Sequence, residues 1–300
     1  MQKTILGGLA GLSLLVSVTH AAPTPTTVEN MIRAAGPGQI STIADVAKAT
    51  NPDLVAEIDA LVDSITGEAA AQKKAILASQ GFFEGWSGEG QAGGFVTSGN
   101  TKDTGVVIGV KLARDGLAWR HAIDALADFQ RSNGTNTREA FRLGYEADYV
   151  ISETWFVYGL AQWERDKFAG FSGRFTESIG IGYIAFDSPA FSLEINGGPA
   201  LRQTRFIATT MLPARSTRKL NFRGTGIIGW NISDGLTFTE EVGMLLGSKN
   251  STYYSRSALT ASLTNVLSAR ISFDIDHETN PPPGVVKTDT STRASLVYNF

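Results

Sequence analysis

Apolar and polar residues alternate one by one along most of the chain after residue 83. Residues 267–276 read LSARISFDID, so every odd-numbered position is apolar and every even-numbered position is polar. Residues 141–149, FRLGYEADY, repeat the pattern, as do residues 119–129, WRHAIDALADF. A period of two is typical of β-strands with one apolar and one polar face. Residues 155–163 are apolar on both faces, so the pattern does not orient that strand.

Turn-forming residues divide this region into twelve strand-like segments whose connections alternate between short and long. The short connections lie near residues 114–116, 151–153, 187–189, 233–235 and 263–265. The long, polar connections lie near residues 98–103, 131–137, 165–174, 203–219, 247–252 and 277–289. Short periplasmic turns at one rim and long extracellular loops at the other are typical of outer-membrane β-barrels. An even number of strands places both ends of the barrel in the periplasm.

The chain ends in a strand, STRASLVYNF, that has to close the barrel. Unpaired backbone groups each cost several kcal/mol in hydrocarbon, so this strand must pair with the first, near residues 85–96. The first strand is rich in glycine, which permits the bending that closure needs. The residues of the last strand expected to face lipid are Ala294, Leu296, Tyr298 and Phe300. A terminal aromatic strand resembles the recognition signal of the outer-membrane barrel assembly machinery, which we expect as a partner.

The N-terminal residues have the pattern of a secretory signal peptide. Lys3 precedes the apolar run 5–18, and small residues then favour cleavage after Ala21, with Ala22 as the second choice. The run is shorter than the ~20 apolar residues that a spanning helix needs, which disfavours a membrane anchor.

Residues 22–82 are predicted to form a helical periplasmic extension. Apolar residues recur at helical spacing between Leu54 and Ile65, and residues 51–53, Asn-Pro-Asp, give a start signal. We expect three or four short helices, interrupted at Gly36-Pro37-Gly38 and at Thr66-Gly67. A cap or spacer is the favoured role, and a partner-binding or barrel-plugging segment is the alternative.

The predicted fold is therefore all-β: a transmembrane antiparallel β-barrel of about 12 strands, preceded by a signal peptide and a short α-helical periplasmic segment. The predicted domains are residues 1–21, 22–82 and 83–300. The 300 residues carry a formal net charge of -3, which gives no indication of nucleic-acid binding. Cysteine is absent, and no motif for a cofactor or a metal is found.

Charged residues on the polar faces are expected to line the lumen. They are Glu89, Lys111, Arg120, Asp124, Asp128, Arg138, Arg142, Glu146, Glu194, Arg223, Glu241, Arg270, Asp274 and Arg293. The set is nearly balanced in charge, so it could form a salt-bridged plug or line a narrow water-filled pore. Twelve strands lie between the eight that side chains can fill and the sixteen that leave a wide channel. A narrow or occluded lumen is favoured.

Two candidate sites lie in the predicted extracellular loops. Asp276 and His277 could activate water at the rim, as an omptin-like protease would, but a second acidic pair is lacking. The net-basic connection 202–223 could bind lipopolysaccharide phosphates through Arg215, Arg218 and Lys219. Lipase chemistry is disfavoured, because His121 beside Trp119 fits a position at the membrane interface.

Several separated motifs resemble one known family. They are Gly85-Trp86-Ser87-Gly88-Glu89, residues 93–101 (GGFVTSGNT), residues 158–166 (YGLAQWERD), residues 177–183 (ESIGIGY) and the terminal Phe300. Together they are similar to the YdiY-like family, described as salt-induced outer-membrane proteins that form a domain of unknown function. The resemblance covers about residues 83–300 and implies an outer-membrane barrel, with no established reaction or ligand.

The expected function is that of a non-enzymatic outer-membrane barrel, structural or stress-related, or a narrow passive pore for small polar solutes. The alternatives are the rim hydrolase, a lipopolysaccharide-binding barrel and a short autotransporter-like translocator. Outer-membrane lipids and lipopolysaccharide are the other expected partners.

Overall fold

The computed structural model describes residues 26–36, 39–96, 103–208 and 212–300. Contacts divide the chain into two compact units, Met1–Lys73 and Lys74–Phe300. The predicted signal peptide, residues 1–21, lies outside the described residues, and the predicted boundary at residue 82 stays a prediction.

The first unit is helical. Its elements are α1 (Thr26–Arg33), α2 (Ile40–Thr50), the 3₁₀ helix η1 (Pro52–Leu54) and α3 (Val55–Ser79), whose last turns belong to the second unit. Ile32, Ala44, Ala47 and Ile58 form a small buried core. No described helix is long and apolar enough to cross a membrane.

The predicted interruption at Thr66-Gly67 was wrong, because α3 runs through both residues as a single helix of 25 residues. A glycine inside a helix costs only about 1 kcal/mol, which the alanine-rich neighbours outweigh. Hydrogen bonds to Asp59 and Asp45 raise the pKa of the Lys48 ammonium, and the bond to Asp59 connects α2 to α3.

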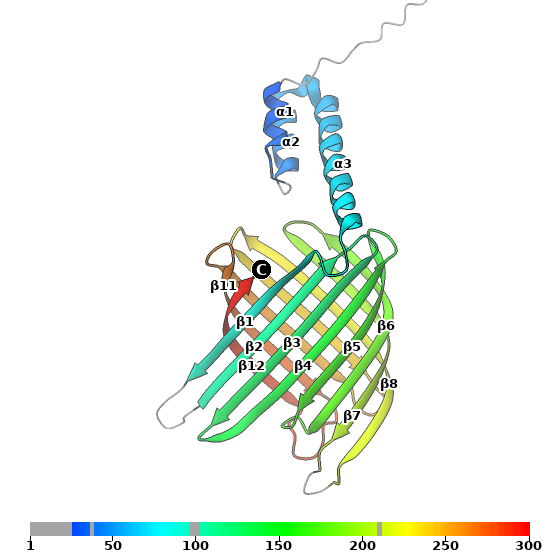
Figure 1. Ribbon diagram of the computed structural model, residues 1–300, viewed down its shortest axis with the longest axis vertical. Coiled ribbons are helices and arrows are strands. Elements are labelled where there is room, and N and C mark those ends of the chain that lie inside the picture. Colours follow the sequence, from blue (N-terminus) through cyan, green and yellow to red (C-terminus); the bar gives the residue numbers. More distant parts are fainter. Residues whose placement is uncertain (1–25, 37–38, 97–102, 209–211) are drawn as a thin grey trace, which may run out of the picture. The chain divides into compact units, whose positions relative to one another are not determined.

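The second unit is a closed barrel of twelve antiparallel strands, in which each strand pairs with its neighbours in the chain and β12 pairs with β1 (Figure 1). The strands are β1 (Trp86–Val96), β2 (Asp103–Asp115), β3 (Trp119–Ser132), β4 (Thr135–Val150), β5 (Trp155–Asp166), β6 (Phe171–Asp187), β7 (Phe191–Phe206), β8 (Arg215–Ser233), β9 (Leu236–Leu246), β10 (Thr252–Ser262), β11 (Leu267–Glu278) and β12 (Thr288–Asn299). The barrel and its strand number are confirmed.

The two rims differ in the length of their connections. At one rim, the turn end, residues 116–118, 151–154, 188–190, 234–235 and 263–266 join the strands. At the other rim, the loop end, the described connections are 133–134, 167–170, 207–214 (in part), 247–251 and 279–287. The predicted loop 98–103 falls almost entirely on residues outside the described ranges.

Three of the predicted long loops are mostly strand, among them 165–174, where β5 continues to Asp166 and β6 begins at Phe171. The connection near 131–137 is a two-residue turn, in which Asn133 and Gly134 have φ values of 48° and 85°. Positive φ at both positions suits the twist of a tight hairpin. The connection near 203–219 is also shorter than predicted, because β7 continues to Phe206 and β8 begins at Arg215.

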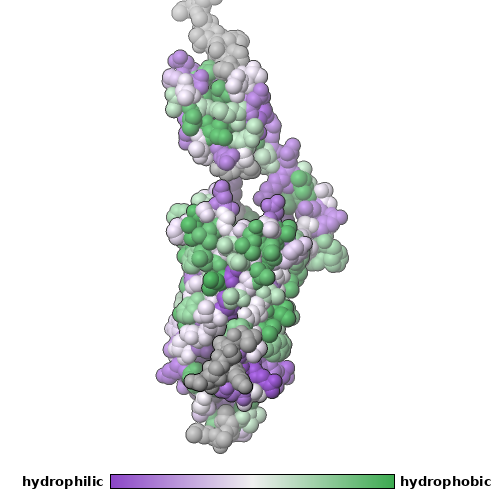
Figure 2. Space-filling model, turned by 90° about the vertical axis from the view of Figure 1, so that its left-hand side faces the viewer, coloured by the Kyte–Doolittle hydropathy of each residue, from purple (hydrophilic) through white to green (hydrophobic). Residues whose placement is uncertain are grey.

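The outer wall of the barrel is apolar. Figure 2 shows apolar side chains gathered over the wall, with polar residues toward the loop end. Ile108, Ile179 and Ile271 are exposed on it, as are aromatic residues near the strand ends such as Trp119 and Phe129. Exposed apolar area of this extent, flanked by aromatic residues, is the surface that a membrane-spanning barrel shows to lipid.

Residues 80–86 pack against this wall at the turn end. The Arg114 guanidinium donates hydrogen bonds to the carbonyl oxygens of Glu84 and Gly81, at 2.9 and 3.1 Å. The ring of His121 stacks on Trp119 and meets the Phe82 ring edge-on. His121 therefore lies in an aromatic cluster at the end of the apolar wall, where the sequence predicted it.

Candidate functional site in the barrel lumen

The structure places all fourteen residues predicted to line the lumen at inward-facing strand positions. Each of them forms at least one ion pair. The pairs are Glu89 with Lys111 and Arg270, Arg120 with Glu194, Asp124 with Arg142, Asp128 with Arg138 and Arg293, Glu146 with Arg223, Glu241 with Arg256, and Asp274 with Arg293. Charged groups inside the barrel are thus arranged so that opposite signs meet.

Near the turn end, Arg120 of β3 joins three strands. Its guanidinium lies 2.8 Å from the Asp148 carboxylate on β4 and 3.0 Å from that of Glu194 on β7. It also lies over the Phe156 ring of β5, 4.5 Å from the ring centroid. Because β3 and β7 are not neighbours in the sheet, the pair with Glu194 crosses the lumen.

Halfway along the barrel, Arg223 of β8 forms a second crossing. Its guanidinium lies 3.7 Å from the Glu146 carboxylate on β4 and donates a hydrogen bond to the Asn196 side chain at 2.8 Å. It also lies 5.3 Å from the ring centroid of Tyr158 on β5, a buried residue whose hydroxyl is 2.9 Å from that of Ser178.

Two further pairs, Asp124 with Arg142 and Glu241 with Arg256, lie beside the Arg223 crossing. We call these three pairs the middle layer.

Glycines on β6 make room for the rings beneath these cations. A Cβ atom on Gly182 would lie 1.9 Å from the Phe156 ring, and one on Gly180 would lie 2.7 Å from the Tyr158 ring. The strand that the sequence could not orient, β5, therefore turns Phe156 and Tyr158 inward and Trp155, Val157 and other residues outward. Its inner apolar face supports the arginine side chains.

Open space remains on the turn-end side of the middle layer. Ala122 and Thr239 face the lumen and are exposed, and the Lys111 side chain is 62% exposed although it pairs with Glu89. The middle layer is therefore a constriction, with wider space on its turn-end side.

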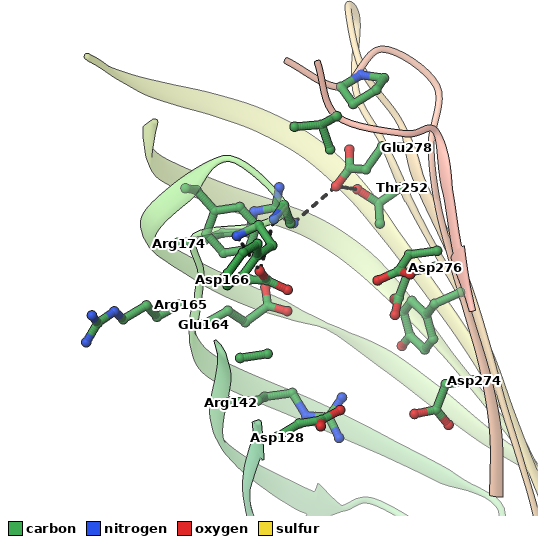
Figure 3. Close-up of a pocket in the computed structure, with 18 of the residues that line it drawn as sticks. Asp128, Arg142, Glu164, Arg165, Asp166, Arg174, Thr252, Asp274, Asp276 and Glu278 are labelled. Carbon is green, nitrogen blue, oxygen red and sulfur yellow. Dashed lines mark hydrogen bonds and ion pairs between the residues drawn. The ribbon is translucent and has the colours of Figure 1, made fainter. Parts of the chain in front are cut away.

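The other side of the middle layer opens into a cavity of about 400 Å³ at the loop end, the loop-end cavity (Figure 3). Asp128, only 3% exposed, meets the guanidinium groups of Arg138 and Arg293 at 2.9 and 2.8 Å. Glu278 meets Arg174 at 3.1 Å and accepts a hydrogen bond from Thr252 at 3.0 Å. The Asp128–Arg293 and Glu278–Arg174 pairs again join strands that are not neighbours in the sheet.

The connection 279–287 packs beside this cavity. Pro282 and Val285 lie against Gly170, which has a φ of 85° and where an added Cβ would be 3.1 Å from the Pro282 ring. At the end of the connection, Arg138 reaches the Asp289 carboxylate at 2.9 Å. The apolar contact at Gly170 joins the connection 279–287 to the connection 167–170, and the ion pair of Asp289 joins its end to β4.

Sequence reasoning missed several inner-wall residues, namely Asp148, Tyr158, Glu164, Arg174, Arg202, Tyr254, Arg256, Asp276 and Glu278. Arg202 was assigned to a loop, and it lies instead on β7, where it donates a hydrogen bond to Thr252 at 2.7 Å. Most of these residues would have been predicted to face the lumen if the alternation had been extended to the ends of the strands as the structure has them.

The candidate Asp276 and His277 pair does not form. The two residues are adjacent on β11, so their side chains point to opposite faces of the wall. Asp276 lies 3.9 Å from the Arg256 guanidinium in the lumen, whereas a ring nitrogen of His277 lies 2.8 Å from the Thr288 hydroxyl. Among the described residues, no group of acidic and histidine side chains that could hold a metal ion is found.

The predicted lipopolysaccharide-binding loop is also corrected. Arg215, Arg218 and Lys219 belong to β8 rather than to a loop. Arg218 is opposite Gln203 on one face of the sheet, whereas Lys219 is opposite Arg202 on the other. The three cations therefore do not share one surface.

The residues proposed as the assembly signal lie on the outer wall of β12. Leu296, Tyr298 and Phe300 are exposed there, in line with Ala294. Phe300 and Gly88 exchange two backbone hydrogen bonds of 2.9 Å, and the Phe300 ring covers Gly88.

Besides Glu139, which pairs with Arg165 near the loop end, the outer wall carries carboxylates on Glu177 and Glu240 among its apolar residues. Glu240 of β9 accepts hydrogen bonds from the hydroxyls of Ser255, at 2.6 Å, and Ser257 on β10. The alternation predicted neither carboxylate.

The fold and this inner wall define a membrane-spanning β-barrel with a charged, constricted lumen. The chain belongs to the DUF481 family of proteins of unknown function, whose model matches residues 90–300. It is 23% identical over 216 residues, 72% of this chain and 83% of the relative, to the uncharacterized protein YdiY of Escherichia coli strain K12. The resemblance inferred from the sequence motifs is confirmed.

Solved outer-membrane barrels are similar in outline. The NanC porin is 12% identical with a TM-score of 0.45, covering 71% of this chain and 100% of the porin. An outer-membrane channel from Pseudomonas putida F1 is 11% identical with a TM-score of 0.43, covering 72% of this chain and 94% of the channel.

Proposed function

We propose that this protein is a non-enzymatic barrel of the bacterial outer membrane, structural or stress-related, with a narrow passive path for small polar solutes. The observation that carries the proposal is the middle layer, in which Arg223 of β8 and Glu146 of β4 meet across part of the lumen at 3.7 Å. The middle layer lies between the loop-end cavity and the turn-end space, where Lys111 and Thr239 face the lumen.

Balanced charge in the constriction suits a weakly selective path. Rings of charge of one sign select ions in channels, whereas the middle layer alternates Asp124, Glu146 and Glu241 with three arginines. The turn end would face the periplasm and the loop end the exterior, as in other barrels of this kind.

The geometry supports this reading over the alternatives. A rim hydrolase needs Asp276 and His277 on one surface, and they lie on opposite faces of β11. An autotransporter-like translocator needs a lumen wide enough for a helix, and the Arg120 and Arg223 crossings occupy that space.

Single-channel conductance in a planar bilayer tests the proposal. We expect small unitary currents from the wild type and larger ones from Arg223→Ala/Glu146→Ala, because this pair spans the constriction. Lys111→Ala is the matched control, since it removes a lumen charge from the wide turn-end space. Large currents from the wild type, or equal currents from the double variant, would overturn the proposal.

The barrel assembly machinery is the partner that this proposal names. The exposed aromatic end of β12 and its closure onto Gly88 support a role for Phe300 in recognition. Deleting Phe300 should reduce the fraction of chains that reach the heat-modifiable, folded form in cells, and Phe300→Leu should reduce it less. Normal insertion of the truncated chain would refute this role.

A further inference from the structure

Glu164 of β5 is an inner-wall carboxylate that meets no cation directly. Its cross-strand neighbours are Arg142 on β4 and Arg174 on β6. Arg142 pairs instead with Asp124, at 3.1 Å, and Arg174 pairs with Glu278, also at 3.1 Å. Within the ranges that the structure describes, no side chain or backbone group forms an ion pair or a hydrogen bond with the Glu164 carboxylate. In this it differs from the inner-wall carboxylates described above.

Two arginines near Glu164 share a different carboxylate. Arg174 and Arg202 lie on neighbouring strands, β6 and β7, and both reach Glu278, at 3.1 and 3.9 Å. Arg202 also donates a hydrogen bond to the Thr252 hydroxyl at 2.7 Å. Both arginines interact electrostatically with Glu164 without forming an ion pair with it. Two guanidinium groups are therefore balanced by one carboxylate in contact and by one at a distance.

Glu164 and these two arginines line the loop-end cavity. Figure 3 shows Glu164 and Arg174 on one side of the cavity and Asp274 and Asp276 on the other. The volume of about 400 Å³ lies in the range of about 300–1,000 Å³ that is usual for ligand pockets. Leu160 adds an apolar side chain to the lining. The cavity therefore has the size and the mixed lining of a site for a small solute.

Charged solutes fit this arrangement poorly. A carboxylate or phosphate bound to Arg174 or Arg202 would lie beside Glu278, which already occupies both cations. An ammonium group bound to Glu164 would lie beside its cross-strand neighbours Arg142 and Arg174. Like charges at close range repel in both cases. An uncharged solute meets neither repulsion.

Hydroxyl groups match the hydrogen-bonding groups that face the cavity. A hydroxyl can both donate and accept a hydrogen bond. Neighbouring hydroxyls of one solute can therefore donate to the Glu164 carboxylate and accept from the Arg174 guanidinium. Such bonds to charged groups are stronger than those between neutral groups. The C–H face of the same solute can lie against Leu160.

We propose that the loop-end cavity binds a neutral polyhydroxylated solute of the size of a monosaccharide, held by hydrogen bonds to Glu164 and from Arg174. This inference deepens the proposed function and rests on it for the route, since it names the class of solute that the narrow path carries. Binding in the cavity does not itself require the solute to cross the middle layer.

Saturation-transfer difference NMR tests the site. The wild-type protein is folded in a detergent without a sugar headgroup and titrated with glucose, a solute of the proposed class. We expect saturable transfer to the glucose protons. Glucuronate and protonated glucosamine carry a carboxylate or an ammonium group on the same ring, and both should bind at least several-fold more weakly because of the charges beside Glu164 and Arg174.

Variants of Glu164 provide the second arm of the experiment. Glu164→Ala should weaken glucose binding by about tenfold or more, because it removes a charge-assisted hydrogen bond. Glu164→Gln keeps the shape of the side chain without its charge, so it should weaken binding less, and it is available if the alanine variant does not fold. Glu177→Ala is the matched control, since Glu177 faces outward on the neighbouring strand β6.

The outcomes separate this site from the proposed path. No saturable binding of glucose, equal affinity for either charged analogue, or unchanged affinity in both Glu164 variants would overturn the proposal. Conductance without glucose binding would refute the site alone. Glucose binding without conductance would refute the path and leave the site in place.

Discussion

The inner and outer walls of this barrel are built from the same strands, but their side chains differ in whether they need polar partners. On the inner wall, carboxylates and guanidinium groups from strands that are not neighbours meet, as Asp128 of β3 does with Arg293 of β12. On the outer wall, apolar side chains face lipid and require no partner. The inner wall therefore depends on specific long-range pairs, whereas the outer wall depends only on composition.

Glu240 is a carboxylate on the outer wall that has hydrogen-bond partners, as most inner-wall carboxylates have. It lies in the apolar wall, yet it accepts hydrogen bonds from two serine hydroxyls of β10, so its carboxylate has polar partners as most carboxylates of the lumen do. A polar group in an apolar medium is tolerated where neighbouring strands satisfy it. Hydrogen-bond satisfaction is therefore required on both walls, and the substitutions below test this requirement together with the packing of the inner wall.

The largest effect is expected at Asp128. Asp128→Ala removes the carboxylate that two largely buried arginines share, which leaves Arg138 only its pair with Asp289 and Arg293 only its pair with Asp274. Breaking a buried pair in this way costs about 3–5 kcal/mol of unfolding free energy, measurable by urea unfolding followed by tryptophan fluorescence. Asp124→Ala is the control, since that side chain is 39% exposed and pairs with Arg142 alone. Equal losses would mean that the inner wall does not depend on its shared pairs.

A smaller effect is expected on the outer wall at Ser255. Ser255→Ala removes one of the two hydroxyl donors of Glu240, and a hydrogen bond to a charged group contributes about 1.5–3 kcal/mol. Glu240→Leu in the same background should recover most of the lost stability, because the carboxylate is then absent. A thermodynamic cycle of these variants measures the coupling, and a coupling of zero would show that the cluster is not held by these bonds.

A loss of unfolding free energy comparable to that at the serine, or smaller, is expected for Gly182→Ala, where the inner wall is packed tightly. Gly182→Ala would place a Cβ 1.9 Å from the Phe156 ring, and the ring could move only by leaving Arg120. Overpacking of this kind costs about 1–3 kcal/mol. Gly90→Ala, with nothing within 4 Å of its added Cβ, should change the urea midpoint little. Phe156→Leu should relieve the Gly182→Ala defect, and a failure to do so would contradict the packing explanation.

The smallest effect is expected at the exposed lumen charge Lys111. Its pair with Glu89 is 3.7 Å long and its side chain is mostly in solvent, so Lys111→Ala should cost no more than about 1 kcal/mol. Arg270→Ala should cost more, because Arg270 binds both oxygens of Glu89 at 2.7 Å. Urea midpoints in the reverse order would contradict the assignment of Arg270 as the main partner of Glu89.

Local patterns were sufficient to predict the faces of the strands. The alternation in β3, β4 and β11 identified inward charges such as Arg120, Glu146 and Asp274 without any knowledge of their partners. The alternation failed where strands continue into polar sequence, as at Gln203 and Lys219, because polar residues on both faces look like a loop. In β5, inward aromatic residues concealed the period.

The pairing across the lumen could not be predicted from the sequence. Whether Arg223 meets Glu146 depends on the register of every strand between β4 and β8. This pairing depends on the three-dimensional closure of the barrel rather than on local composition.

The constriction by the middle layer can be measured most directly by the thiol reactivity of two single-cysteine variants, since the chain has no cysteine of its own. Ala122→Cys lies on the turn-end side of the middle layer and Gln130→Cys lines the loop-end cavity. In vesicles with one protein orientation, a bulky charged thiol reagent added at the loop end should modify Gln130→Cys and leave Ala122→Cys unmodified. Modification of both variants from the same side would contradict a lumen narrowed by its ion pairs.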